Sequence, residues 1–266
     1  MAKNRIHLYN AASSRAIDND ATAPIAQGGL GITGYDLMTR AAAYALASFC
    51  ERWPDAPGFS LFCGKGNNAG DGYVMAQMAK QLGLDVQIFA AVDPSLLTGD
   101  AHRAYHECLA NGLLIEDLGA PIRHLIIVDA LLGTGFYPPV REDIASAISR
   151  INAHTGDILS LDLPSGVSAD RGVWGGRSDK HVRASLTVSF ITRKVGLHTG
   201  AGIAARGALL VADLGVAAAI FARYPSISLL NWSSSRLPSA EVNTHKSHQG
   251  HVLVVGSGRA VLYVRR

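Results

Sequence analysis

Short apolar runs and longer amphipathic segments alternate along most of this chain. A short apolar run bounded by turn residues predicts a buried strand, and apolar residues three or four positions apart predict a helix packed on a sheet. The predicted strands are 60–63, 86–92, 124–128, 158–161, 186–190 and 208–211, and the predicted helices are 9–20, 34–51, 73–81, 99–110 and 143–154. Strands that alternate with helices imply right-handed βαβ crossovers. We therefore predict an α/β fold, a three-layer Rossmann-like sandwich with a mostly parallel sheet.

A glycine-rich stretch follows the first predicted strand. Residues 64–72 read Gly-Lys-Gly-Asn-Asn-Ala-Gly-Asp-Gly and lead into the helix predicted from Tyr73. A strand, a glycine-rich turn and a helix form the arrangement in which backbone N–H groups face an anion such as phosphate. A plain turn with Asn68 or Asp71 as the helix N-cap is the simpler alternative. Two adjacent asparagines and a carboxylate among glycines favour a binding loop.

Further carboxylates follow two other predicted strands. Asp129 comes directly after 124–128, and Asp162 comes directly after 158–161. Because ligands bind outside the carboxyl ends of strands in open α/β sheets, these residues and Asp71 are expected to meet at one edge. A carboxylate at the end of a buried strand must be solvated, paired or coordinated, since burying it bare is very costly. The chain therefore predicts a binding site at this edge.

A lysine follows the strand predicted at 186–190. Lys194 could neutralise a phosphate at the same edge of the sheet, or it could lie on the surface in solvent. Because lysines are rarely buried without a partner, we expect a solvated surface lysine here.

The composition is that of an ordinary globular protein of 266 residues, with 48% hydrophobic and 17% charged residues. This length accommodates one large α/β domain, or one domain and a fragment. A net charge of +3 is too small to indicate a nucleic-acid partner. Residues 1–28 contain no apolar signal segment, and the most apolar stretch, 208–222, is interrupted by Asp213 and too short to span a bilayer. Neither nucleic acid nor membrane is therefore expected as a partner.

The cysteines indicate the redox compartment. Cys50, Cys63 and Cys108 stand in no metal-ligand or redox spacing, and each lies in an apolar pattern. They are expected to be small core residues in a reducing compartment. Together with the absence of a visible targeting segment, this predicts a cytoplasmic protein.

Three segments together resemble the NAD(P)H-hydrate epimerase family, the N-terminal half of the bifunctional nicotinamide-nucleotide repair enzymes. They are 64–72, 128–135 (Val-Asp-Ala-Leu-Leu-Gly-Thr-Gly) and 161–167 (Leu-Asp-Leu-Pro-Ser-Gly-Val). The resemblance covers residues 8–215, and the family usually has glycine where this chain has Ala69. It implies that the protein interconverts the R and S epimers of NADHX and NADPHX, which are hydrated at C6 of the nicotinamide ring.

The resemblance also implies the residues of the site. A potassium ion would be held by Asn68, Asp129 and Ser165. The substrate would be contacted by Asn67, Asn68, Ala69, Gly70, Asp71, Gly133, Thr134, Gly135, Phe136, Tyr137, Pro138, Pro139 and Asp162. Since C6 is a hemiaminal carbon, the reaction needs a carboxyl group that gives and takes a proton. Asp129 is the first candidate for this acid/base role and Asp162 the second. A homodimer is left open.

The resemblance divides the chain into 1–222, an epimerase domain, 223–242, a linker, and 243–266, the start of an ADP- or ATP-dependent dehydratase domain. The last part rests on His245, Lys246 and the run 250–256. It is too short for a dehydratase, and its closing residues depart from the Gly/Ala-rich continuation of that family. We expect a truncated or frameshifted product without dehydratase activity.

Two other functions compete with this interpretation. Gly64, Gly66 and Ala69 also match the Rossmann dinucleotide fingerprint, with Asp85 or Asp93 as the candidate ribose ligand. That pattern would indicate an NAD-dependent oxidoreductase, but a Rossmann helix should begin with small apolar residues rather than Asn-Asn-Ala-Gly-Asp. A non-catalytic nucleotide-binding scaffold is the second alternative. All the polar residues of the three motifs are present, which argues against a scaffold without catalytic activity.

Overall fold

The computed structural model of this chain describes residues 6–173 and 181–229. His7–Ser228 form one compact unit, and a second unit comprises Met1–Ile6 and Leu229–Arg266. The predicted dehydratase start at 243–266 lies outside the described residues, as does the linker beyond residue 229.

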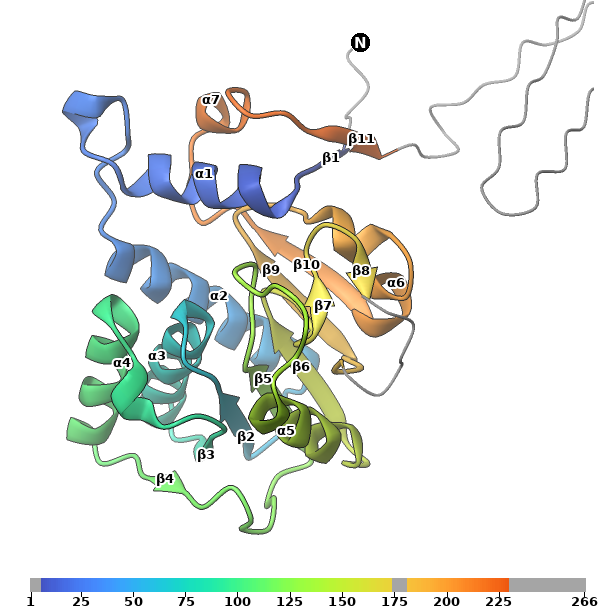
Figure 1. The fold of residues 1–266 in the computed structure, drawn as a ribbon. Coiled ribbons are helices and arrows are strands. Elements are labelled where there is room, and N and C mark those ends of the chain that lie inside the picture. Colours follow the sequence, from blue (N-terminus) through green and yellow to red (C-terminus); the bar gives the residue numbers. More distant parts are fainter. Residues whose placement is uncertain (1–5, 174–180, 230–266) are drawn as a thin grey trace, which may run out of the picture. The chain divides into compact units, whose positions relative to one another are not determined.

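A seven-stranded sheet forms the centre of the larger unit (Figure 1), with the order β10-β9-β6-β5-β2-β3-β4. Its strands are β2 (Gly58–Cys63), β3 (Asp85–Ala90), β4 (Ile115–Glu116), β5 (Ile126–Ala130), β6 (Asp157–Leu161), β9 (Leu186–Phe190) and β10 (Ala208–Ala212). Every neighbouring pair is parallel, which confirms the predicted sheet. Along the chain, β2 is followed by β3 and β4 toward one edge of the sheet, and β5 is followed by β6, β9 and β10 toward the other edge. The sheet therefore has a switch point between β2 and β5, where open α/β sheets bind ligands.

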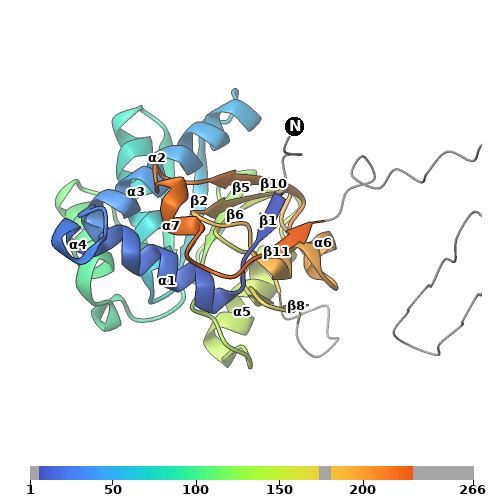
Figure 2. The ribbon, with the colours of Figure 1, turned by 90° about the horizontal axis from the view of Figure 1, so that it is seen from above.

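Helices cover both faces of this sheet. The helices α2 (Gly34–Arg52), α3 (Asn67–Gln81) and α4 (Gly99–Ala110) lie on one face, and α5 (Glu142–Asn152) lies on the other (Figure 2). Successive strand residues point to opposite faces. Leu61 and Val128 accordingly pack under α2 and α3, whereas Phe62 and Ile127 pack under α5. The predicted three-layer α/β sandwich is thus confirmed.

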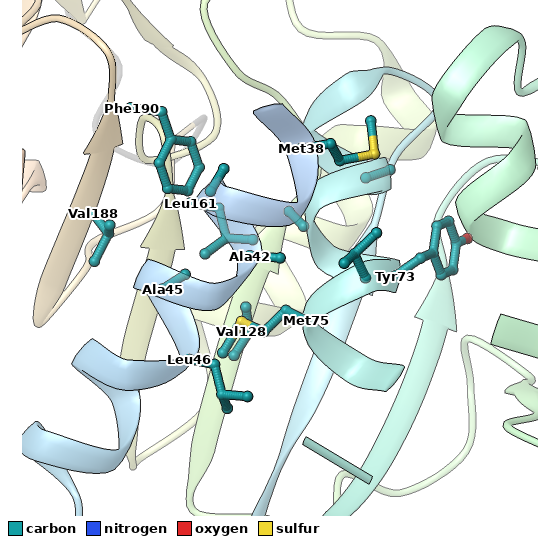
Figure 3. Packing of buried hydrophobic residues seen from close by; sticks show 14 of the residues in the cluster. Met38, Ala42, Ala45, Leu46, Tyr73, Met75, Val128, Leu161, Val188 and Phe190 are labelled. Carbon is teal, nitrogen blue, oxygen red and sulfur yellow. The ribbon is translucent and has the colours of Figure 1, made fainter. Parts of the chain in front are cut away.

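Small residues allow α2 and α3 to pack closely over the sheet. Ala42 and Ala45 of α2 are fully buried and lie near the strand residues Val128 and Val188 (Figure 3). In α3, a Cβ added at Gly72 would lie 2.9 Å from Cβ of Ala130 in β5. Real Cβ atoms essentially never approach so closely. The glycine is therefore required for this helix to lie directly on the sheet.

Two element boundaries differ from the prediction in ways that matter for the site. The helix α3 begins at Asn67 rather than at residue 73, with Gly66 as its N-cap. Residues 67–72 are thus the first helical turns and not a loop, because packing on the sheet overrides the low helix propensity of glycine. The strand β5 runs to Ala130, so Asp129 lies within the strand rather than after it. The two-residue edge strand β4 was not predicted because it is too short to leave a pattern.

The helix α1 (Ala11–Thr22) lies across the carboxyl ends of the sheet strands (Figure 1). It begins with an N-cap, since Oδ1 of Asn10 accepts a hydrogen bond from the backbone N–H of Ser13 at 2.7 Å. The remaining elements are β1 (Ile6–Leu8), β7 (Val167–Ser168), β8 (Gly172–Val173), β11 (Ile227–Leu229), α6 (Gly202–Ala205), α7 (Ala218–Phe221) and the 3-10 turns η1 (Ile25–Gln27), η2 (Pro94–Leu96) and η3 (Val195–His198). Among the described residues, no helix combines the length and apolar character needed to cross a membrane.

Candidate active site

A cavity of about 1030 Å³ opens at the carboxyl ends of the central strands. Its walls come from α1, from the first turns of α2 and α3, and from the segments that follow β5, β6 and β9. Of the predicted substrate contacts, it is lined by Asn67, Asn68, Asp71, Gly133, Thr134, Gly135, Phe136, Tyr137, Pro139 and Asp162. Ala69, Gly70 and Pro138 are not among the lining residues. Most of the predicted contacts thus meet in one cavity, at the switch point of the sheet.

Asp162 is the most strongly held carboxylate of this cavity. Its Oδ1 lies 2.5 Å from Nζ of Lys194, and its Oδ2 accepts hydrogen bonds from the backbone N–H of Thr134 at 2.8 Å and from Oγ1 of Thr134 at 2.6 Å. Burial alone would raise the pKa of Asp162, but the charge of Lys194 and these hydrogen bonds outweigh burial and lower it. Asp162 is therefore ionised and its oxygens are occupied.

Lys194 is buried, which corrects the expectation of a solvated surface lysine. Only 2% of the residue is exposed. Besides Asp162, its ammonium group donates to Oγ of Ser189 at 3.1 Å and to the backbone oxygen of Phe190 at 2.6 Å. These three acceptors match the three N–H donors of the lysine. The local sequence pattern could not reveal this, because the compensating carboxylate comes from a different strand end.

Two residues at these strand ends have an unusual backbone conformation. Asp162 has φ +63° and Ile191 has φ +61°. The left-handed region is rare for a β-branched residue such as Ile191. Both residues line the cavity directly after β6 and β9. Such outliers cost about 1–3 kcal/mol each and cluster at functional sites, so they support a functional role for this end of the sheet.

Asp129 is fully buried and does not line the cavity. Its Oδ1 accepts hydrogen bonds from Oγ of Ser165 at 2.5 Å and from the backbone N–H of Leu131 at 3.2 Å. Its Oδ2 accepts from Oγ of Ser160 at 2.8 Å and from the backbone N–H of Ser165 at 2.9 Å. Burial raises the pKa of Asp129, and the hydrogen bonds from Ser165, Ser160 and Leu131 oppose the rise. This geometry places Asp129 outside the cavity, and the acid/base role expected for it stays a prediction.

Asn68 contributes an oxygen atom that is buried without a partner. Its Nδ2 donates to the backbone oxygen of Leu132 at 3.1 Å, whereas its Oδ1 accepts no hydrogen bond from the described residues. Ser165 is joined to the same segment, because its Oγ accepts from the backbone N–H of Leu132 at 2.9 Å. Asn68, Asp129 and Ser165 therefore converge on residues 131–132. A buried carbonyl oxygen without a partner is costly, which leaves room for a ligand at this point.

The donor set at this point consists of oxygen atoms only. Amide, carboxylate, hydroxyl and backbone oxygens suit a hard cation rather than a transition metal. Within residues 6–173 and 181–229, no group of three or more His, Cys, Asp or Glu could hold a metal ion. The residues of the predicted potassium site thus fit that ion in their chemistry.

Two carboxylates that line the cavity, Asp18 and Asp100, were not predicted from the sequence. Asp18 of α1 lines the wall together with Asp71 of α3. Burial raises the pKa of Asp18, and so does the charge of Asp162, against the effect of Lys194. Burial also raises the pKa of Asp71 well above its usual range, with further contributions from Asp162 and Asp18. Asp18 left no signal in the sequence, because nothing local places its helix over the end of the sheet.

The candidate ribose ligands of the Rossmann alternative lie elsewhere. Oδ2 of Asp85 is 3.0 Å from Nε2 of His124, and Asp93 caps the turn η2 by accepting from the backbone N–H of Ser95 at 2.9 Å. Neither aspartate lines the cavity. The dinucleotide fingerprint therefore lacks its acidic partner here.

The family model and the curated relatives that match this chain indicate the same family. The family model described as YjeF-related protein N-terminus matches residues 34–196. The chain is 39% identical to the bifunctional NAD(P)H-hydrate repair enzyme Nnr of Coxiella burnetii, over 85% of this chain and 47% of that protein. It is 34% identical to the Nnr enzyme of Escherichia coli, over 85% of this chain and 44% of that protein. The chain thus spans about half the length of these bifunctional relatives.

A shorter relative matches over most of its own length. The NAD(P)H-hydrate epimerase of Legionella pneumophila (strain Philadelphia 1) is 32% identical, over 75% of this chain and 77% of that protein. The crystal structure of yeast ynu0 superposes with a TM-score of 0.62 at 22% identity, over 73% of this chain and 85% of that chain. At this identity the superposition establishes the likeness of the folds.

Proposed function

Because this chain belongs to the family of the YjeF-related protein N-terminus, we propose that it interconverts the R and S epimers of NADHX and NADPHX at C6 of the nicotinamide ring. The observation that carries the proposal is the cavity at the switch point of the sheet. It joins the start of α3, the loop 133–139 and Asp162, all of which the resemblance assigns to the substrate. The expected absence of dehydratase activity, the cytoplasmic location and a homodimer stay predictions.

The start of α3 suits the phosphate groups of a dinucleotide. The first N–H groups of a helix have no partner within the helix, and the helix dipole favours an anion at this end. Asn67 and Asn68 occupy the first turn of α3 and line the cavity together with Lys65. We propose that the pyrophosphate lies here, with the loop 133–139 along the opposite wall.

A potassium ion is part of the proposal. Asn68, Asp129 and Ser165 would hold it, and its oxygen ligands would include the Oδ1 atom of Asn68 that has no other partner. When bound, the ion supplies a fixed positive charge that compensates the buried carboxylate of Asp129. The residues themselves connect β5 and the turn after β6 to the first turn of α3, and so position the start of that helix.

The epimerisation needs a proton donor, a cavity that holds the nicotinamide ring, and a negative charge that stabilises the cationic intermediate. Protonation of the C6 hydroxyl lets the ring nitrogen expel it as water, which leaves a planar cationic ring that water can attack from either face. The ionised Asp162, held by Lys194, lies in the wall where such a cation would form. Its negative charge is fixed before the reaction, which is the condition for electrostatic stabilisation of a charged intermediate.

Epimerisation of a single NADHX epimer tests the proposed function. The purified protein is incubated with one epimer, and the two epimers are separated by chromatography over time. We expect both epimers to form faster than in buffer, and no reduced-nicotinamide absorbance to appear when ADP or ATP is added. An epimer ratio that relaxes at the rate of the buffer control would contradict the proposal. Tight NADHX binding without turnover would support the scaffold function instead.

A further inference from the structure

We propose that Asp71 is the catalytic acid and base of this site, and that Asp18 acts through it as a positioning residue. The inference rests on the proposed epimerase function and names the group that moves the proton. It departs from the assignment that the motif resemblance suggested, in which Asp129 came first and Asp162 second.

The three carboxylates predicted from the sequence, Asp71, Asp129 and Asp162, differ in whether they are free to exchange a proton. Asp129 lies outside the cavity with four hydrogen-bond donors on its two oxygens. Asp162 lines the cavity, but its oxygens are occupied by Lys194 and Thr134. A proton donor must reach the substrate oxygen without first breaking a structural ion pair. Neither of these two residues meets that condition.

Asp71 meets it. Its position in the second turn of α3 lines the cavity, and no described residue donates a hydrogen bond to its carboxyl group. The residue is only partly exposed, so its carboxyl is largely removed from water but remains in contact with the cavity. It is thus the cavity carboxyl on α3, the helix whose first turn is proposed to hold the pyrophosphate.

The electrostatic environment favours the protonated form of Asp71. Burial raises the pKa of its carboxyl well above the usual range, and the charges of Asp162 and Asp18 raise it further. Lys194 opposes them, but its ammonium group is bound to Asp162. The charged groups Arg15, Lys65, Asp100 and Arg141 line the same cavity, and none of them is a cause of the shift.

Asp18 reaches this site from α1. The helix is held over the end of the sheet by Ser14, whose Oγ lies 2.7 Å from Oγ1 of Thr192, and by its first N–H, which donates to Oδ1 of Asp170 at 2.6 Å. The charge of Asp18 raises the pKa of Asp71. Asp18 thus affects the pKa of the proton donor, Asp71, and need not contact the reacting atoms itself.

The proposed step balances. The acid form of Asp71 gives its proton to the C6 hydroxyl oxygen, the C6–O bond breaks, and water leaves. The lone pair of the ring nitrogen forms a double bond to C6, and the ring becomes cationic. Water then adds to the other face, the electron pair returns to nitrogen, and the surplus proton returns to Asp71. Nothing is oxidised or reduced, and the negative charges of Asp18 and Asp162 stabilise the cationic ring.

The main test compares Asp71→Asn with the wild type in the NADHX epimer assay. We expect kcat to fall about 10²–10⁴-fold with KM little changed, since general acid–base catalysis contributes that factor. Asp71→Glu should recover part of kcat, because it restores the exchangeable proton. Asp55→Asn is the matched control: it removes the charge of an exposed aspartate distant from the cavity and should leave kcat unchanged. Thermal unfolding of each variant establishes that it is folded.

The second test is the pH profile of kcat/KM. Because the acid form of Asp71 is the active one, kcat/KM of the wild type should fall as the pH rises through the raised pKa of Asp71. Asp18→Asn removes a negative charge and should move this falling limb to lower pH. A purely structural role of Asp18 would lower the rate at every pH without moving the limb, and that result would overturn its assignment.

The outcomes separate this inference from the proposed function. A wild-type protein that epimerises NADHX, together with a folded Asp71→Asn variant of near wild-type kcat, would overturn the assignment of Asp71 and leave the function intact. A wild-type protein without epimerase activity would overturn the proposed function itself.

Discussion

Nζ of Lys194 lies 2.5 Å from Oδ1 of Asp162, and the two side chains are only 3% and 11% exposed. This ion pair joins the end of β6 to the segment after β9 and forms part of the cavity wall. Removing one partner of a buried ion pair leaves an uncompensated charge, which is more damaging than removing both.

Lys194→Met is therefore expected to destabilise the protein by about 3–5 kcal/mol at neutral pH. The double variant Lys194→Met/Asp162→Asn should lose less than the sum of the two single variants. Urea unfolding measures both. The pair lowers the pKa of Asp162 in the folded state, so its stabilisation is present above the unfolded pKa and is lost as the pH falls through the folded one. The deficit of Lys194→Met should accordingly shrink in acid, and a deficit that grew in acid would contradict this account.

The pKa of Asp71 is shifted in the opposite direction, with the opposite consequence for stability. Its folded-state pKa is raised, so the stability it contributes is fully present below the unfolded pKa and is lost as the pH rises through the folded pKa. Asp71→Asn has no ionisable group at this position, so it does not lose stability in this way as the pH rises. We expect the melting temperature of Asp71→Asn relative to wild type to increase from acid to alkaline pH. Calorimetry across that range is the measurement, and a constant difference would show that Asp71 is not perturbed.

Potassium should stabilise the folded protein by binding the proposed oxygen ligands of Asn68, Asp129 and Ser165. A ligand that binds only the folded state raises stability by RT ln(1 + [L]/Kd). Replacing potassium chloride by tetramethylammonium chloride at equal ionic strength should therefore lower the melting temperature of the wild type. Asn68→Leu lacks the Oδ1 atom and should show no such difference. An equal potassium effect in both proteins would place the ion elsewhere.

Gly72→Ala tests the close packing of α3 on β5. The added Cβ would lie 2.9 Å from Cβ of Ala130 and 3.1 Å from Cδ1 of Leu61, so it forces the helix away from the strand. Overpacking of this kind costs about 1–3 kcal/mol. Gly135→Ala is a matched control, because no atom lies within 4 Å of the added Cβ and the backbone does not have a positive φ. Chemical denaturation should separate the two variants, and equal stabilities would argue against the close contact.

The sequence by itself determined the fold class and most of the residues of the site. Apolar periodicity is a local property, so the strands and helices of the sheet, such as α4 at Gly99–Ala110, were predicted from short windows. Asn68, Asp71 and Asp162 were found because they stand at strand ends or at a helix start, and parallel strands bring those ends to one edge. The spacing of the three motifs, which is also a property of the sequence, was sufficient to indicate the family.

Only the tertiary structure decided the surroundings of each of these residues. Asp129 and Asp162 each follow an apolar run in the sequence, yet one is buried inside β5 and the other lines the cavity. The environments of Lys194 and Asp18 are set by groups on other elements, and Lys194 and Asp162 are 32 residues apart in the sequence. The reason is physical. The period of a side-chain pattern is set by neighbours in the chain, whereas a buried charge is stabilised by whichever group the folded chain brings within hydrogen-bond distance.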